Sequence, residues 1–182
     1  MRRIALFLGA CVVVALGGAC RDSKPPVVSG PSVADSADQM LIGVHYVLTT
    51  NGVARGQLNA DTAYVLDDQT RFDLRHTHVT FTTETGAPQG TMDGNRGMYS
   101  QRTQILEGWG DVVVRLVDGR MLKSPHVTYN QITHRISSDT SYTLVRGADS
   151  QYGIGFESNQ TFTSFRCLRQ CGGKTSVLIP ER

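Results

Sequence analysis

Residues 105–139 read ILEGWGDVVVRLVDGRMLKSPHVTYNQITHRISSD, and this stretch decides the fold. Short runs rich in valine, leucine and isoleucine are separated by polar residues, and no catalytic motif interrupts them. Gly108 and Gly110 lie inside a strand pattern, where glycine commonly marks a bend. Asp118-Gly119, between two such runs, is a strong hairpin signal. The stretch therefore predicts antiparallel strands, the first of them bent, joined by a tight turn.

The same pattern continues from about residue 40 to about residue 165. Segments of five to eight residues rich in Val, Thr, Tyr and Phe alternate with turn signals, and no helical period of any length is present. The turn signals are Asn51-Gly52, Asp67-Asp68, Gly86-Ala87-Pro88, Asp93-Gly94-Asn95, Asp118-Gly119 and Gly147-Ala148-Asp149. The chain is predicted to form one all-β domain over residues 39–165.

Residues 70–81 predict that the sheet is curved. The face that carries Phe72 and Leu74 gives way to a face that carries Val79 and Phe81, so the alternation changes phase. A bulge or bend near residues 75–77 would produce this change, and bulges with interior glycines are how a sheet is made to curve.

A weak internal repeat accompanies the strands. Tyr64, Tyr99, Tyr129 and Asn159 follow one another at steps of 35, 30 and 30 residues. A repeat of this length predicts units of two strands that stack to share one core.

The N-terminus is typical of an exported protein. Two arginines precede an apolar run and a small-residue site in MRRIALFLGACVVVALGGAC, which is the order of a secretory signal. Cys20 directly follows the small residues, as in a bacterial lipoprotein, so we expect residues 1–19 to be removed and Cys20 to be lipidated. An uncleaved membrane anchor and simple secretion remain as alternatives, since residues 4–20 reach the lower limit of a spanning length.

Residues 20–38 contain three prolines and four serines, and we expect them to form a flexible tether. Removing residues 1–19 removes two arginines and no acid, so the net charge falls from +2 to 0. The lysines are few and the arginines are scattered, so the mature chain offers no basic patch for nucleic acid.

Two cysteines remain in the C-terminal segment, residues 166–182. Cys167 and Cys171 are four apart, which in a straight strand would separate them by about 13 Å, too far for a disulfide. A turn brings the Cα atoms to about 6 Å, which allows one. We expect a small disulfide clip here, in keeping with an oxidising compartment; half of a metal site is the alternative.

Several residue pairs could suggest chemistry, but none has a supporting motif. His76 and His78 have a chelating spacing without an identifiable third ligand. Glu84 and Glu107 could be imagined as a carboxylate pair, as a carbohydrate-processing enzyme would need. A third set, His134 with Ser137, Ser138 and Asp139, lacks a nucleophile elbow. We therefore expect no enzymatic activity, no metal site and no cofactor.

The order of several motifs resembles that of a known family. GQLNAD at residues 56–61, ILEGWGDVVV at 105–114, DGRMLKSPHVTYN at 118–130, RISSD at 135–139 and YGIGFESN at 152–159 follow in that order. The recurring L-E-G-x-G-x-V-x-V unit and the closing G-x-G-F-x-S-N are similar to those of LptC-related, OstA-like lipopolysaccharide export proteins. The resemblance covers about residues 40–165.

This resemblance implies a twisted, partly open antiparallel β-jellyroll with an apolar interior trough. The trough would hold acyl chains of lipopolysaccharide or a similar glycolipid. The partners would be a periplasmic OstA-like or LptA-like protein of the same fold and an inner-membrane ABC transporter. The interior lining is predicted to consist of Phe72, Leu74, Val112, Val114, Leu116, Val127, Tyr129, Leu144, Ile154 and Phe156. Trp109, next to the predicted bend, is expected to lie in this lining as well.

The sequence therefore predicts a lipid-anchored component of lipopolysaccharide export at the periplasmic face of a membrane, the inner membrane being preferred to the outer. It would pass glycolipid to its partner without chemical reaction. The alternative is a structural or adhesion lipoprotein whose apolar residues fill a closed β-sandwich and bind no lipid.

Overall fold

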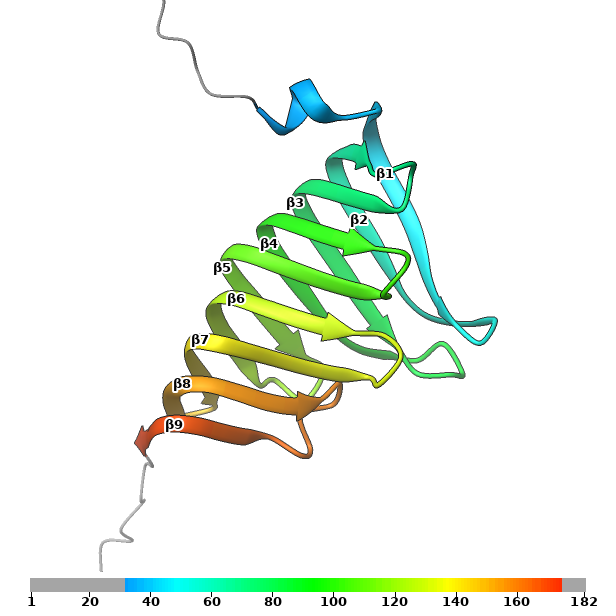
Figure 1. Cartoon of the computed structure of the whole chain (residues 1–182). Coiled ribbons are helices and arrows are strands. Elements are labelled where there is room, and N and C mark those ends of the chain that lie inside the picture. The colour runs from blue at the N-terminus through cyan, green and yellow to red at the C-terminus, as the bar shows by residue number, and fades with distance from the viewer. Residues whose placement is uncertain (1–31, 175–182) are drawn as a thin grey trace, which may run out of the picture. The chain divides into compact units, whose positions relative to one another are not determined.

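The computed structural model describes residues 32–174, which form one antiparallel sheet preceded by a short 3-10 helix. Cys20, the predicted signal segment and most of the predicted tether lie outside the described residues. The elements are η1 (Val33–Ser36), β1 (Gln39–Thr50), β2 (Val53–Leu66), β3 (Arg71–Thr82), β4 (Pro88–Ser100), β5 (Ile105–Leu116), β6 (Met121–Asn130), β7 (Arg135–Arg146), β8 (Asp149–Asn159) and β9 (Arg166–Lys174). Each strand pairs with the strands before and after it in sequence, so β1 and β9 are the two edges (Figure 1).

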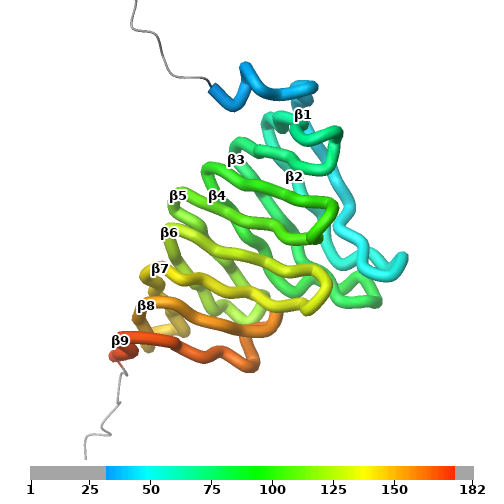
Figure 2. The backbone as a smooth tube through the Cα atoms, viewed as in Figure 1, coloured from blue at the N-terminus to red at the C-terminus, as the bar shows by residue number. Residues whose placement is uncertain are grey.

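The strands are bent near their middle, and the bends follow one line across the sheet. His76 in β3, Gly110 and Asp111 in β5, and Gly155 in β8 all have positive φ, between 48° and 73°. The strand registers shift by one residue at this line from β4 onward. The phase change predicted near residues 75–77 is confirmed by His76, and the whole backbone folds over along the line (Figure 2).

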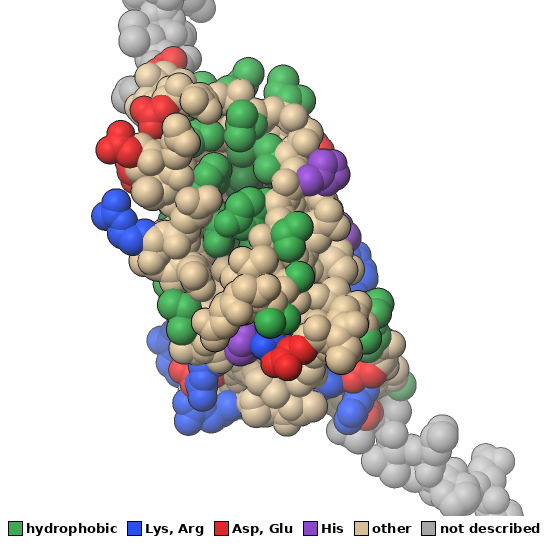
Figure 3. All heavy atoms as spheres, turned by 90° about the vertical axis from the view of Figure 1, so that its right-hand side faces the viewer, with side chains coloured by type: hydrophobic (Ala, Val, Ile, Leu, Met, Phe, Trp, Pro, Cys, Tyr) green, Lys and Arg blue, Asp and Glu red, His purple; other side chains and the backbone are tan. Residues whose placement is uncertain are grey.

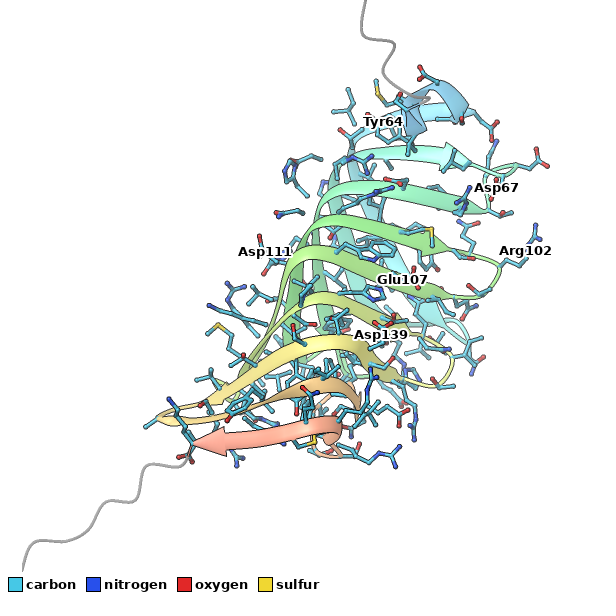
Figure 4. The ribbon with its side chains drawn as sticks, turned by 60° about the vertical axis from the view of Figure 1, so that its left-hand side comes forward. Tyr64, Asp67, Arg102, Glu107, Asp111 and Asp139 are labelled. Atoms are coloured by element: carbon cyan, nitrogen blue, oxygen red, sulfur yellow. A yellow bond between two sulfur atoms is a disulfide. The ribbon has the colours of Figure 1, made fainter. Side chains whose placement is uncertain are left out.

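The bend divides the sheet into two facing limbs. Limb A contains the strand portions that meet at the turns 67–70, 101–104, 131–134 and 160–165. Limb B contains the portions that meet at the turns 51–52, 83–87, 117–120 and 147–148. Figure 4 shows Asp111 on the bent side of the sheet, with Asp67 and Arg102 on the opposite side. We call that opposite side, where the turns of both limbs lie, the mouth.

The turns are partly those that the sequence predicted. The predicted turns at Asn51-Gly52, Asp67-Asp68, Gly86-Ala87, Asp118-Gly119 and Gly147-Ala148 do connect strands. The prediction of a turn at Asp93-Gly94-Asn95 was wrong: these residues lie in the middle of β4, at its bend, and the turn into β5 is at residues 101–104. Gly94 lies where β4 bends. A short sequence pattern that contains glycine looks the same at a bend within a strand as at a turn between two strands.

The sheet also extends further than predicted. Residues 166–174, expected to be part of a tail, form β9 and pair with β8. Cys167 and Cys171 are joined by a disulfide with Cα atoms 6.0 Å apart. Gln170 between them has a φ of 48° and marks a bulge in the strand. This bulge, and not the expected turn, brings the two cysteines close enough for the disulfide.

Candidate lipid-binding interior

Two rows of apolar side chains face each other between the limbs. Each row has one residue from every strand between β2 and β7, aligned by the strand registers. The limb A row is Val65, Phe72, Tyr99, Leu106, Tyr129 and Ile136. The limb B row is Leu58, Val79, Met92, Val114, Leu122 and Leu144. All of these side chains except Val65, together with Leu48, Leu74, Phe81, Val112, Val127 and Phe156 beside them, belong to one core cluster or pack against it. Val65 is buried but lies outside that cluster.

Nine of the ten residues predicted to line the interior belong to this cluster or pack against it. Leu74, Val112, Val114, Val127, Tyr129 and Phe156 are at most 1% exposed, and Phe72, Leu116 and Leu144 are partly buried against them. Several lining residues were not predicted, among them Val65, Leu58, Met92, Leu122 and Ile136. Only the register of the strands identifies them, because it places them in the same two rows as predicted lining residues.

Ile154 was wrongly placed on the inward face. It is half-buried and lies outside the core cluster, whereas Gly153 and Phe156 on either side are buried. Gly155, with a φ of 71°, inserts an extra residue at the bend of β8. The phase therefore changes between Ile154 and Phe156, which the strict alternation used for the prediction did not allow for.

Trp109 also lies outside the lining. Its ring stacks on the imidazole of His126, with centroids 5.1 Å apart and planes 7° from parallel, and it is absent from the core cluster. Gly108 before it is buried and inward-facing, so alternation turns Trp109 outward. The bend itself is confirmed, at Gly110 and Asp111.

The C-terminal end of the interior is filled by aromatic side chains from the 160–165 loop. Phe165 stacks on both Phe156 and Phe162, and the Phe162 ring is tilted against that of Phe156. Phe165 also packs edge-on against Tyr142. Arg120, from the turn of limb B, donates hydrogen bonds to the backbone oxygens of Phe162 (2.5 Å) and Thr161 (2.8 Å) in limb A. A charged side chain thus joins the two limbs across the mouth at this end. Arg120 also donates to the Asp118 carboxylate at 2.7 Å, and this hydrogen bond keeps the pKa of Asp118 below its usual value.

The N-terminal end is the more open one. Viewed from the mouth, apolar side chains show in a strip between the limbs over the N-terminal half, while polar groups cover the mouth further down (Figure 3). In β1, Leu41 is 41% exposed, and Val44 and Tyr46 are only partly covered where they meet the core. β1 also carries Met40 (58%), Ile42 (78%) and Val47 (53%) on its surface.

Polar groups lie inside the mouth between these two ends. Tyr99 donates to the Oε1 atom of Gln131 at 3.2 Å, and Thr50 of limb B contacts the backbone oxygen of Gln131 at 3.4 Å. Burial raises the pKa of Tyr129 to about 12 and also raises that of Tyr99, so both phenols are neutral at physiological pH.

The fold does not bring the carboxylate pair or the histidine pair together as a site. Glu84 pairs with Arg55 at 2.5 Å, and Glu107 lies in β5 across from Met98 and Thr128. His76 pairs with Asp61 at 3.0 Å and His78 with Asp93 at 2.6 Å, in different directions along the sheet.

The serine-rich segment in β7 likewise forms structural contacts. Ser138 is within hydrogen-bond distance of Ser124 and Thr140, and Asp139 contacts His126 rather than His134. That contact with His126 holds the pKa of Asp139 below its usual value. Among residues 32–174, no group of three or more His, Cys, Asp or Glu side chains is placed to hold a metal ion.

A bent, open antiparallel sheet with facing apolar limbs defines the class of β-jellyroll proteins to which lipopolysaccharide-transport components belong. The chain belongs to the LptC-related family of lipopolysaccharide-assembly proteins, whose sequence model matches residues 4–172.

A solved structure has the same fold. It is the crystal structure of LptH from Pseudomonas aeruginosa, described as the LptA-homologous periplasmic component of the lipopolysaccharide transport device. The TM-score is 0.54 at 12% sequence identity, over 67% of this chain and 95% of that one. A comparison with curated proteins gives no match. In the part of the chain that the structure covers, no helix is both long and apolar enough to cross a membrane.

Proposed function

We propose that this chain is a periplasmic component of lipopolysaccharide export that holds acyl chains of lipopolysaccharide, or of a similar glycolipid, between its two limbs. The observation that carries the proposal is the pair of facing apolar rows in an unclosed sheet. Each CH₂ group of an acyl chain buried there would contribute about 0.8 kcal/mol. Affinity would thus need no catalytic or ionic motif, in keeping with a transport component and not an enzyme.

Entry of lipid would occur at the N-terminal end and through the mouth. The central lining side chains are nearly inaccessible, so a bound chain must displace them by moving the limbs apart. The limbs are continuous at the bend, whereas hydrogen bonds across the mouth, such as those of Arg120 and Thr50, are few and local. Opening at the mouth therefore costs less than any rearrangement of the strand ladder.

Photo-cross-linking of the full chain to lipopolysaccharide tests this function. A photoreactive residue replacing Val114, which is 1% exposed and faces limb A, should form an adduct with lipopolysaccharide. The neighbouring Arg115 points outward and pairs with Asp93, so the same group there is the matched control. Equal labelling at both positions, or none at Val114, would favour the alternative of a structural lipoprotein with a closed core.

The edge strands would provide the partner contacts. β1 and β9 each have one neighbour in the sheet, so their outer backbone groups can pair with a strand of another chain. A periplasmic LptA-like protein of the same fold could extend the sheet at one edge, and a subunit of an inner-membrane ABC transporter could supply lipid at the other. Cross-linking from β1 and β9 separately in cells, followed by identification of the adducts, would assign each edge its partner.

The chain would be held at the membrane through Cys20, with residues 20–38 as a tether for the domain. The sequence before Cys20, an apolar run followed by small residues, supports this proposal, because that order is typical of a bacterial lipoprotein signal. Mass spectrometry of the mature N-terminus checks it: a diacylated or triacylated Cys20 is expected, and an intact residue 1 would indicate an uncleaved anchor instead.

A further inference from the structure

Three of the buried hydrogen-bond donors without an acceptor belong to Tyr129, its near neighbour Gln131 and Arg55 of the opposite limb, at the mouth of a largely apolar interior. The donors are the Nε atom of Arg55, the hydroxyl group of Tyr129 and the Nε2 atom of Gln131. None of them has a hydrogen-bond partner among the described residues. Tyr129 and Gln131 are each 1% exposed. Leaving such a group unpaired costs about 1–3 kcal/mol, and buried polar groups in native proteins are nearly always paired.

The three groups come from both limbs, and all three residues lie near the rim of the mouth. Tyr129 is next to the last residue of β6, and Gln131 directly follows that strand, so both lie at the limb A rim. Arg55, near the start of β2, belongs to limb B, and its positive charge is close enough to Tyr129 to oppose the rise in the pKa of that phenol. The contact between Thr50 and the Gln131 backbone oxygen bridges the limbs at the same level.

The chemistry of the three groups indicates what they would bind. Guanidinium and amide nitrogens only donate hydrogen bonds, so the complementary ligand must supply oxygen acceptors. Arg55 is already neutralised by Glu84 at 2.5 Å, which favours an uncharged oxygen over a phosphate. An ester or amide carbonyl satisfies both conditions.

The depth of the limb gives the position of that carbonyl along a lipid. From the rim at Asn130 to the bend at His126, limb A of β6 has five residues. This corresponds to about 16 Å of strand, close to the roughly 15 Å thickness of one hydrocarbon leaflet. An acyl chain reaching from the rim to the bend would therefore place its carbonyl at Tyr129 and Gln131.

We propose that Arg55, Tyr129 and Gln131 form a polar subsite that receives the ester or amide carbonyl of an acyl chain lying in the interior. This inference rests on the proposed acyl-chain binding and adds a specificity to it. The interior recognises acyl-linked lipids in preference to lipids whose chains carry no carbonyl.

Two probe lipids of equal chain length test the subsite: a lysolipid with an ester-linked chain and its ether-linked counterpart. The wild-type chain should bind the ester about five-fold more tightly, the effect of one net hydrogen bond. Tyr129→Phe and Gln131→Met should bring the ester affinity down to that of the ether and leave the ether affinity unchanged. Tyr129→Phe keeps the ring that packs on Phe81, with centroids 5.0 Å apart, so the fold should persist, which thermal unfolding checks.

Tyr142→Phe is the matched control. Its hydroxyl is also buried and unpaired, but its ring packs on Phe156 and Phe165 at the C-terminal end. This variant should keep the full preference for the ester. Equal binding of both lipids by the wild type, or an equal loss in Tyr142→Phe, would overturn the subsite while leaving acyl-chain binding intact. If neither lysolipid binds and Val114 gives no adduct with lipopolysaccharide, the proposed function fails and the subsite fails with it.

Discussion

Phe81 lies in limb B between two glycines, Gly56 and Gly90, which face it from the neighbouring strands. A Cβ atom at Gly56 would lie 2.3 Å from the backbone oxygen of Thr80, and one at Gly90 would lie 2.5 Å from that of Arg115. Backbone cannot move aside as a side chain can. Glycine at these positions lets the strands approach closely around the large ring, which then reaches Tyr129 of limb A.

Replacing Gly90 by alanine should therefore destabilise the fold. We expect Gly90→Ala to lower the free energy of unfolding by about 1–3 kcal/mol, because the added methyl group overpacks a filled ladder. Gly108→Ala, in the next strand, is the control: its Cβ would meet Val112 at 3.4 Å, an ordinary contact. That variant should be neutral or slightly stabilised. Denaturant unfolding measures both, and an equal cost at the two positions would contradict this account.

The buried tyrosines make the fold sensitive to alkaline pH. The pKa of Tyr129 is raised from 10.0 to about 12, so between those values the unfolded chain releases a proton that the folded chain keeps. Unfolding is then favoured as pH rises, by up to about 1.4 kcal/mol per pH unit for this group, and the stability is fully present below pH 10. Tyr129→Phe should flatten the fall in the free energy of unfolding between pH 10 and 12. An unchanged slope would mean that the phenol is not held neutral by the fold.

At the scale of elements, the 160–165 loop depends on one side chain from the opposite limb. The Arg120 side chain is 13% exposed and donates to the backbone oxygens of Thr161 and Phe162. The backbone amide of Phe162 donates to the backbone oxygen of Asn159, the last residue of β8. The aromatic packing of Phe162 and Phe165 is thus fixed from limb B.

Replacing Arg120 by methionine keeps the aliphatic stem and removes the donors. We expect Arg120→Met to lower the free energy of unfolding by about 2–3 kcal/mol, the range for hydrogen bonds from a charged group. Hydrogen exchange at the Phe162 amide should become faster, while that of β4 and β5 stays slow. Arg135→Met, at an exposed arginine 3.5 Å from Glu157, should change neither. Unchanged exchange in Arg120→Met would show that the aromatic contacts alone hold the loop.

The sequence predicted those elements whose conformation is set by nearby residues. It missed those that depend on contacts with another part of the chain. The bends of β3 and β5 were predictable, because a phase change at residues 75–77 and a glycine at 110 record them in the chain itself. The turns at 101–104 and 131–134 contain no glycine or proline, so nothing marked them. β9, with the sequence RCLRQCGGK, has no apolar alternation and is a strand because β8 offers it an edge.

The interior was predicted only on the faces that show regular alternation. Val112, Val114 and Val127 follow the period of a strand, whereas Ile154 is displaced by the bulge at Gly155. The polar subsite could not be predicted, because single residues such as Arg55 and Gln131 form no motif and meet only when limb A faces limb B.

The whole molecule has two free sheet edges, β1 and β9, and we therefore expect it to associate with other chains through them. β1 is the longer edge, with 12 residues, and it exposes large apolar side chains on its outward face. β9 has nine residues, and its bulge is braced by the Cys167–Cys171 disulfide. Flat, apolar edges are those most ready to pair.

A lysine in the exposed edge should suppress this association. We expect the wild-type domain to associate with itself as its concentration rises. Ile42, in β1, has a side chain that is 78% exposed, and Ile42→Lys should weaken the association at least several-fold because it places a charge in the contact between the two chains. Val117→Lys, 69% exposed in a turn of limb B, carries the same charge away from both edges and should behave as the wild type. Sedimentation velocity compares the three; equal behaviour of the two variants would place the contact elsewhere.

The strict succession of strands has a consequence for how the chain reaches its fold. Every ladder joins segments that are consecutive in sequence, so the sheet is a one-dimensional array of nearest neighbours with low contact order. No strand needs a partner that is distant in sequence. Strand pairing can therefore start at either end of the sheet and proceed hairpin by hairpin while the rest of the polypeptide is still unfolded. A chain exported unfolded across a membrane would gain from this, since each hairpin finds its place as soon as it emerges.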